Sequence, residues 1–169
     1  PVSRAGLRDA ANRAGWLAIV PEGWQASLGS AGDPGTLLGL RASEGLEPMV
    51  VSIQEVADEF SGGVVHPEAI KRLMQHARAS WARSPGYLVL GSDTHVNPRG
   101  YPGIWATAAP VGVPSPLFVV GQPRWAAETG RDGWYGLLEG DDDVPEVAVG
   151  RLPASSPGQL AGIAAKLVA

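Results

Sequence analysis

Short apolar runs alternate along the chain with segments of helical periodicity. The clearest run is Trp-Leu-Ala-Ile-Val at residues 16–20, and Pro21 ends it. A run that is apolar at every position predicts a strand covered on both faces, as in a parallel sheet. Comparable runs predict four further strands, at residues 49–53, 87–90, 117–120 and 147–149.

Helices are predicted between these strands. The strongest signal lies at residues 67–81, where Pro67 and Glu68 occupy the first turn and apolar residues then recur at steps of mostly three and four. Weaker signals predict helices at residues 3–14, 36–42, 54–60 and 157–168. Strands that alternate with helices in this order predict an α/β fold with a mainly parallel sheet and right-handed crossovers.

Size, charge and composition narrow the classes of protein. The 169 residues suit one domain, with residues 1–15 as a helical lead-in and residues 16–169 as the main body. The net charge of −4 argues against a non-specific nucleic-acid binder. The absence of cysteine excludes disulfides, thiolate metal sites and a cysteine nucleophile within this stretch. No apolar run approaches the roughly 20 residues of a membrane span. Because the chain starts at Pro1, we expect a processed product or a piece of a longer protein.

Ligands of parallel sheets bind at the carboxyl ends of the strands. That rule selects three places, at residues 92–101, 131–143 and 150–151. No phosphate-binding glycine motif follows the first strand, and no G-x-S-x-G nucleophile motif occurs.

The three histidines are candidates for proton transfer. His95 follows the third predicted strand and has Asp93 two residues before it, so the two side chains could serve acid–base chemistry. A solvated loop histidine is the alternative. His66 is expected to be a helix cap or a solvated loop residue, and His76 a surface residue.

Two acidic segments are candidates for ligand binding. Asp141, Asp142 and Asp143 could gather calcium with their carboxylates, or form an ordinary acidic turn before the strand at residue 147. In residues 131–135, Asp132 could bind a cation while Trp134 or Tyr135 lines an apolar wall. The alternative is a packed aromatic with a surface acid beside it.

Three stretches, in this order, resemble a known family. The first is residues 58–63 with the helix that opens at Pro67, and the second is residues 87–94. The third and most specific runs through residues 132–136, 140–142 and 145–153. Together they resemble the gingipain-like cysteine peptidases of the clostripain clan, which have a caspase-like fold. The resemblance covers residues 16–168, and Ser92 stands where the family usually has glycine.

The resemblance implies an incomplete three-layer α/β sandwich with a mainly parallel sheet. In the family a thiolate attacks the scissile carbonyl and an imidazole manages the protons, and both residues lie beyond the Gly-Arg strand. None of this chain's histidines occupies that position, so we expect an N-terminal part of a secreted or cell-surface endopeptidase, inactive alone. It would contribute the fold and part of the cleft wall, with no catalytic residue of its own.

The expected site follows from position and from the family. Asp132, Trp134 and Tyr135 are predicted to face a peptide substrate, by position and charge only. No cofactor is expected for the chemistry, but the family binds calcium, which favours a structural ion at Asp141, Asp142 and Asp143. A sheet cut part-way would expose an edge or an apolar face, so the expected partner is the remainder of the peptidase domain or another copy of the chain.

A second hypothesis about the function stays open. The chain could be a non-catalytic, caspase-like binding or scaffold module. In that case Asp132 and the acidic turn would recognise a cationic or calcium-bridged partner, and the lack of cysteine fits this directly.

Overall fold

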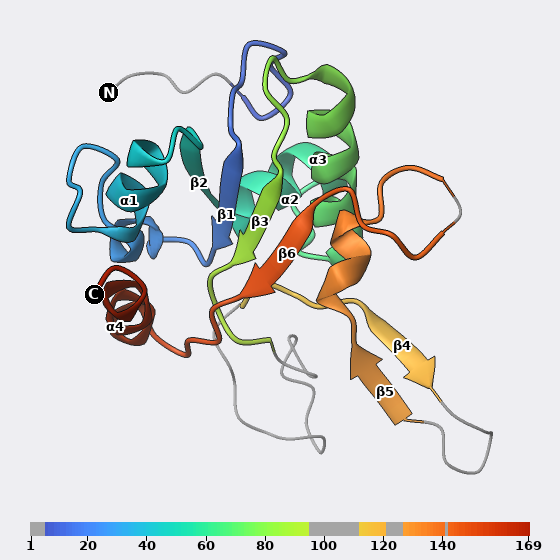
Figure 1. The fold of residues 1–169 in the computed structure, drawn as a ribbon. Helices are drawn as coiled ribbons and strands as arrows, with labels where there is room; N and C mark the ends of the chain where they lie inside the picture. The colour runs from blue at the N-terminus through green and yellow to red at the C-terminus, as the bar shows by residue number, and fades with distance from the viewer. Residues whose placement is uncertain (1–5, 95–111, 121–126, 141) are drawn as a thin grey trace.

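A four-stranded parallel sheet forms the centre of the protein. The computed structural model describes residues 6–94, 112–120, 127–140 and 142–169. The sheet contains β1 (Trp16–Val20), β2 (Pro48–Ser52), β3 (Tyr87–Leu90) and β6 (Ala148–Arg151), in the order β2-β1-β3-β6 (Figure 1). All three pairings are parallel. Four of the predicted apolar runs therefore lie side by side in one layer.

Helices cover both faces of this sheet, which confirms the predicted three-layer α/β architecture. One face carries α2 (Ile53–Ser61), α3 (Pro67–Ser80) and the 3-10 helix η2 (Asp132–Gly136). The other face carries the 3-10 helix η1 (Gln25–Leu28), α1 (Leu37–Ser43) and α4 (Pro157–Lys166). No helix in the described ranges is long and apolar enough to cross a membrane.

The alternation of strand residues explains why β1 is apolar throughout. Leu17 and Ile19 belong to the core on the α2–α3 side, whereas Trp16, Ala18 and Val20 belong to the core on the α1–α4 side. All five are buried. A strand with helices on both faces needs apolar side chains at every position, and this is the pattern from which the parallel sheet was predicted.

Local signals fix the starts of the helices on the α2–α3 side. The Ser52 hydroxyl accepts a hydrogen bond from the Glu55 N–H, and the Glu55 carboxylate accepts one from the Ser52 N–H. This capping box starts α2 directly after β2. At α3, His66 is the N-cap and Pro67 occupies the first turn, as the sequence predicted.

The predicted helix at residues 3–14 is wrong over its described part. Residues 6–14 form turns and one isolated bridge, because their backbone groups bind other parts of the protein. The Glu59 carboxylate accepts hydrogen bonds from the N–H groups of Leu7 and Arg8, and the Trp81 indole donates to the Leu7 carbonyl. These contacts tie the segment to the ends of α2 and α3, so it joins the main body.

The predicted strand at residues 117–120 exists but does not join the main sheet. As β4 (Leu117–Val120) it pairs antiparallel with β5 (Ala127–Gly130), which the sequence did not predict as a strand. The hairpin projects from the body of the protein beside η2 (Figure 1). The chain between β3 and β6 therefore carries an arm that is separate from the sheet.

Candidate functional site

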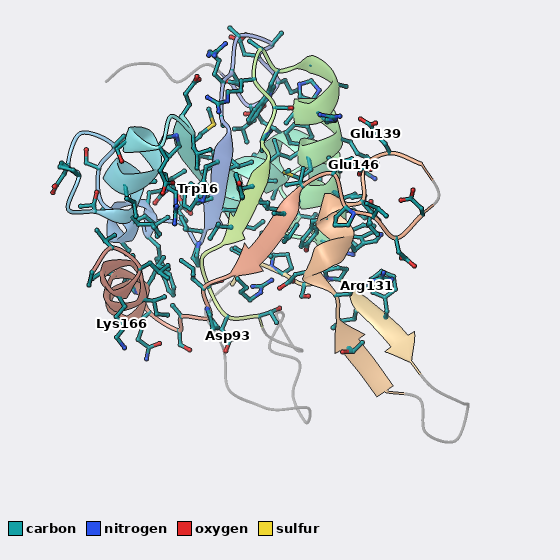
Figure 2. The ribbon with its side chains drawn as sticks, in the orientation of Figure 1. Trp16, Asp93, Arg131, Glu139, Glu146 and Lys166 are labelled. Carbon is teal, nitrogen blue, oxygen red and sulfur yellow. The ribbon has the colours of Figure 1, made fainter. Side chains whose placement is uncertain are left out.

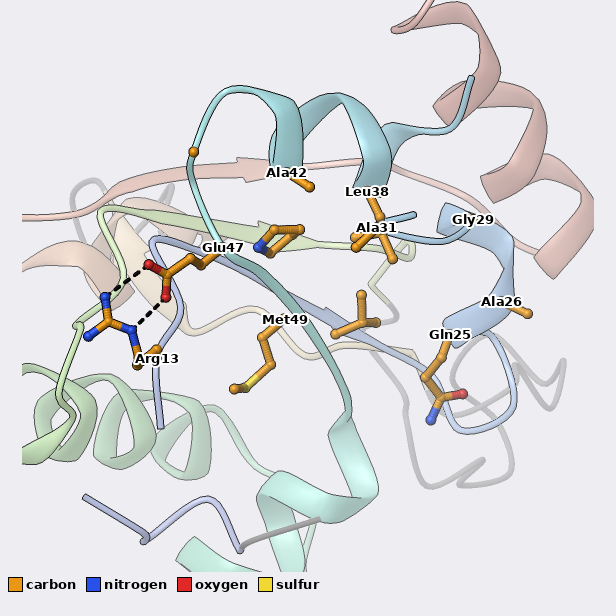
Figure 3. A pocket seen from close by; sticks show the side chains of 12 residues that line it. Arg13, Gln25, Ala26, Gly29, Ala31, Leu38, Ala42, Glu47 and Met49 are labelled. Carbon is orange, nitrogen blue, oxygen red and sulfur yellow. Dashed lines mark hydrogen bonds and ion pairs between the residues drawn. The ribbon is translucent and has the colours of Figure 1, made fainter. Parts of the chain in front are cut away.

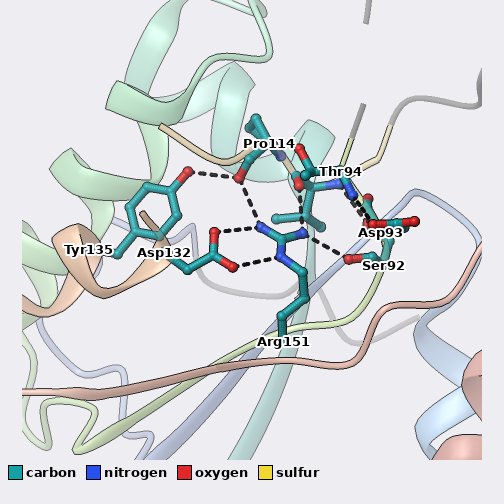
Figure 4. Close-up of polar contacts among 8 residues, drawn as sticks. Ser92, Asp93, Thr94, Pro114, Asp132, Tyr135 and Arg151 are labelled. Carbon is teal, nitrogen blue, oxygen red and sulfur yellow. Dashed lines mark hydrogen bonds and ion pairs between the residues drawn. The ribbon is translucent and has the colours of Figure 1, made fainter. Parts of the chain in front are cut away.

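Arg151 ends β6 at the carboxyl edge of the sheet and forms a two-pronged ion pair with Asp132 of η2. Its Nε lies 2.7 Å from Asp132 Oδ2, and its Nη2 lies 2.8 Å from Oδ1 (Figure 4). The side chains are only 13% and 25% exposed. This fork-to-fork geometry is the strongest arrangement that a guanidinium and a carboxylate can form.

The same guanidinium gathers the neighbouring chain segments. Arg151 Nη1 donates to the carbonyls of Ser92, at 2.8 Å, and Val113, at 2.9 Å, and Nη2 donates to the carbonyl of Pro114 at 3.3 Å. The Ser92 hydroxyl accepts a hydrogen bond from the Val113 N–H at 2.7 Å. We call Ser92, Val113, Pro114, Asp132 and Arg151 the arginine hub.

The hub unites the three places that the carboxyl-end rule selected from the sequence. Ser92 follows β3, Asp132 begins η2 and Arg151 ends β6. Figure 2 shows Asp93 and Arg131, the neighbours of two hub residues, at the end of the sheet toward which its strands point. The sequence identified where these residues lie but did not identify Arg151 as the partner of Asp132.

The direction of the pKa shift of Asp132 is the one expected for a carboxylate that is paired with Arg151. Burial alone raises the pKa of Asp132, but hydrogen bonds from Arg151 and Ser115 and the charge of Arg151 outweigh it, so the pKa is lowered. Burial, with a smaller effect from Asp132, raises the pKa of the Tyr135 phenol. The Tyr135 hydroxyl donates a hydrogen bond to the Pro114 carbonyl at 2.8 Å.

Trp134 is held by contacts to α3 and to the hairpin. The Lys71 ammonium of α3 donates to the carbonyls of Trp134, at 2.7 Å, and Leu137. It also lies 4.6 Å from the centroid of the Trp134 ring. Burial lowers the pKa of Lys71, against the opposing charges of Glu68 and Glu146. The ring of Phe118 in β4 packs edge-on against the Trp134 ring, with 6.3 Å between the two ring centroids.

The three residues predicted to bind substrate therefore share one short helix. Asp132 is already paired with Arg151, and the Tyr135 side chain is fully buried in the core. Trp134 is half-buried between α3 and the hairpin. Their contacts within the chain are structural, and their part in substrate binding stays a prediction.

The acidic turn is held by contacts of its own. The Asp142 carboxylate accepts a hydrogen bond from the Val144 N–H at 3.0 Å, and Asp143 pairs with Arg131 at 2.7 Å on the surface. Asp141 lies outside the described residues. Within the described ranges, no three His, Cys, Asp or Glu side chains are grouped to hold a metal ion, and calcium at this turn stays a prediction.

The described histidines have contacts within the chain. His66 Nδ1 accepts the N–H of Glu68 at 3.2 Å, which confirms the predicted helix cap. His76 Nε2 lies 3.2 Å from the Arg8 carbonyl, and its ring centroid is 5.7 Å from that of Phe60, so it helps to fasten the N-terminal segment. His95 lies outside the described residues.

A groove runs along β2, the strand at the opposite side of the sheet from β6 (Figure 3). Its walls are mainly apolar, with Met49 between two polar ends. At one end Glu47 accepts a two-pronged hydrogen bond from Arg13, at 2.8 and 2.9 Å, and a further bond from Arg83. These hydrogen bonds lower the pKa of Glu47 to about 2.

Comparison with known proteins identifies the family. The model of Peptidase family C25 matches residues 11–169. This chain belongs to peptidase family C25. The resemblance to the gingipain-like peptidases is thereby confirmed. None of the curated proteins matches this C25 chain.

A solved structure supports the fold of this C25 chain. The crystal structure of dimeric latent PorU from Porphyromonas gingivalis matches with a TM-score of 0.61 and 18% sequence identity. The match covers 88% of this chain and 15% of the PorU chain. The likeness shows a shared, caspase-like fold, and this C25 chain corresponds to a small share of the PorU chain.

Proposed function

We propose that this C25 chain is the N-terminal, non-catalytic part of a gingipain-like cysteine endopeptidase. It supplies part of the fold and part of the cleft wall, while the cysteine and histidine of the reaction come from elsewhere in the longer protein. The arginine hub carries this proposal. At the edge where a parallel sheet binds its ligands, the principal charged groups are joined to each other and to backbone carbonyls.

Such a closed network suits a wall better than a reactive centre. Nucleophilic catalysis by a peptidase needs a nucleophile within hydrogen-bonding reach of a base. The chain has no cysteine, and the contacts of its described histidines are with backbone groups and Phe60. The hub instead fixes the relative positions of β3, β6, η2 and residues 112–114, which a neighbouring catalytic segment would need.

The proposal extends to partners and location. The expected partner is the remainder of the peptidase region, and a peptide is the substrate of the longer protein. Secretion or display at the cell surface, and a structural calcium ion, rest on the family resemblance. The alternative, a scaffold that recognises a cationic partner through Asp132, is less well supported because that carboxylate already binds Arg151.

Peptide cleavage tests the proposal. The 169-residue chain and the longer protein that contains it are assayed on a mixed peptide library under reducing conditions, with and without a thiol-alkylating reagent. We expect no cleavage by the isolated chain and alkylation-sensitive cleavage by the longer protein. Cleavage by the isolated chain, or cleavage by the longer protein that resists alkylation, would contradict the proposal.

A further inference from the structure

The geometry points to η2 as a cover that keeps the outer edge of β6 from pairing with the same strand of a second copy. Edge strands present unpaired backbone groups that recruit other strands, and proteins protect such edges with prolines, charges, bulges or a covering segment. The two edges of this sheet, β2 and β6, are protected in different ways. This inference is independent of the proposed function.

The edge at β2 is protected by its own sequence. The bonds from Tyr87 to the Gly15 carbonyl and from Gly91 to the Ile19 carbonyl show that odd-numbered residues of β1 face β3. By alternation, Pro48 and Ser52 of β2 face away from β1. Proline has no N–H to offer, and the Ser52 N–H is bonded to the Glu55 carboxylate.

The edge at β6 lacks such a device in its sequence. The N–H groups of Ala148 and Leu152 bond to carbonyls at the two ends of β3, so even-numbered residues face inward. The peptide groups of Val147, Val149 and Arg151 therefore face the other side of β6. The strand sequence is Ala-Val-Gly-Arg, which contains no proline and no lysine, and its one charged side chain, Arg151, is paired with Asp132.

The 3-10 helix η2 packs on the α2–α3 face of the sheet through Tyr135 and also extends along the outer side of β6 (Figure 1). A Cβ added to Gly136 would come within 2.3 Å of the Val147 carbonyl oxygen, so the end of η2 sits directly against the outward peptide group. The start of η2 is held beside the end of β6 by the Asp132–Arg151 pair. The helix η2 therefore runs alongside the whole length of β6, in the direction opposite to the strand.

Two further contacts fasten the cover from other elements. The Lys71 ammonium binds the carbonyls of Trp134 and Leu137, which ties the last turn of η2 to α3. The Glu146 N–H donates to the Gly136 carbonyl at 2.9 Å, which ties the same turn to the approach of β6. Only glycine fits at residue 136, so the single methyl group of an alanine should be enough to displace η2 from β6.

The experiment measures self-association of the 169-residue chain by sedimentation velocity over a wide concentration range, with circular dichroism to show that each variant is folded. We expect the wild type to sediment as a monomer of 17.5 kDa. Gly136→Ala should displace η2 and produce dimers or larger species. Gly133→Ala in the same helix is the matched control, because its new Cβ meets nothing within 4 Å, and it should stay monomeric.

Two more variants keep the outcome decisive. Lys71→Met removes the hydrogen bonds that tie η2 to α3 and adds no clash, so this variant should also self-associate. It takes the place of Gly136→Ala if that variant does not fold. Val149→Pro removes an N–H that faces away from β3, and added to either variant it should restore the monomer. The inference is overturned if the folded variants remain monomeric, or if the association persists with Val149→Pro, or if the wild type itself associates through β6.

Discussion

Arg151→Met is expected to lower the stability of the chain by more than any surface ion pair contributes. The substitution keeps most of the side-chain stem but removes every hydrogen bond that Arg151 donates within the arginine hub. It leaves the Asp132 carboxylate three-quarters covered without its counter-charge, and three carbonyls without this donor. Breaking a buried pair at one partner costs 3–5 kcal/mol, and since Asp132 retains some exposure we expect about 3 kcal/mol.

Urea denaturation at neutral pH measures this effect. With an m-value of about 2 kcal/mol/M, a loss of about 3 kcal/mol moves the midpoint down by about 1.5 M. Arg78→Met is the matched control, because it breaks a single contact to Glu139 between exposed side chains, and its midpoint should stay near that of the wild type. If the midpoint of Arg151→Met moves no further than that of this control, the Asp132–Arg151 pair contributes no more than a surface ion pair.

Acid should reduce the difference between Arg151→Met and the wild type. The pKa of Asp132 lies below its ordinary value of 3.8 in the folded protein, so the stability from the ion pair is present above that value. It is lost as the pH falls through the lowered pKa. In Arg151→Met the unpaired carboxylate is relieved by protonation, so the two midpoints should converge below about pH 4.

Three other predictions concern local features. Ser52→Ala removes the capping box with Glu55, and thermal unfolding should show a loss of about 1 kcal/mol. The pKa of Glu47 is lowered to about 2, so the stability that its ion pairs contribute is present above the ordinary pKa of 4.5 and is lost as the pH falls toward 2. Glu47→Gln removes this contribution, so the free energy of unfolding should fall less steeply with acid than in the wild type. Gly39→Ala would place a Cβ 1.8 Å from the Asp33 carbonyl oxygen, so the melting temperature should fall; an unchanged one would contradict the described approach of α1 to that loop.

Much of the fold follows from local sequence. Strands such as β1 and β3 are apolar runs of four or five residues, and their period and length distinguish them from helices. The carboxyl-end rule then placed Ser92, Asp132 and Arg151 in one region without any knowledge of contacts, and the structure joins all three. The alternation of these runs with helices predicted the parallel sheet, and the family resemblance, most specific at residues 132–153, added its three-layer arrangement.

Tertiary contacts decide what local sequence could not. Residues 6–14 have acceptable helix signals, but the Glu59 carboxylate and the Trp81 indole bind their backbone instead. The strand β5 contains Glu and Gly and has no apolar alternation, so only its pairing with β4 defines it. The role of Lys71 could not be predicted either, because the groups that accept its hydrogen bonds are backbone carbonyls more than 60 residues away.

The order of strands in the sheet also sets an order of assembly. The β1–β2 pairing joins residues 32 positions apart (Trp16 with Pro48), whereas the β1–β3 and β3–β6 pairings join residues 71 and 61 positions apart (Trp16 with Tyr87, and Tyr87 with Ala148). Contacts that close longer loops form later, because their entropy must be lost before any bond rewards it. The β1–β2 pair can therefore form first, while the β1–β3 and β3–β6 pairings follow at similar, larger entropic costs, and Arg151 holds β6 once it has paired.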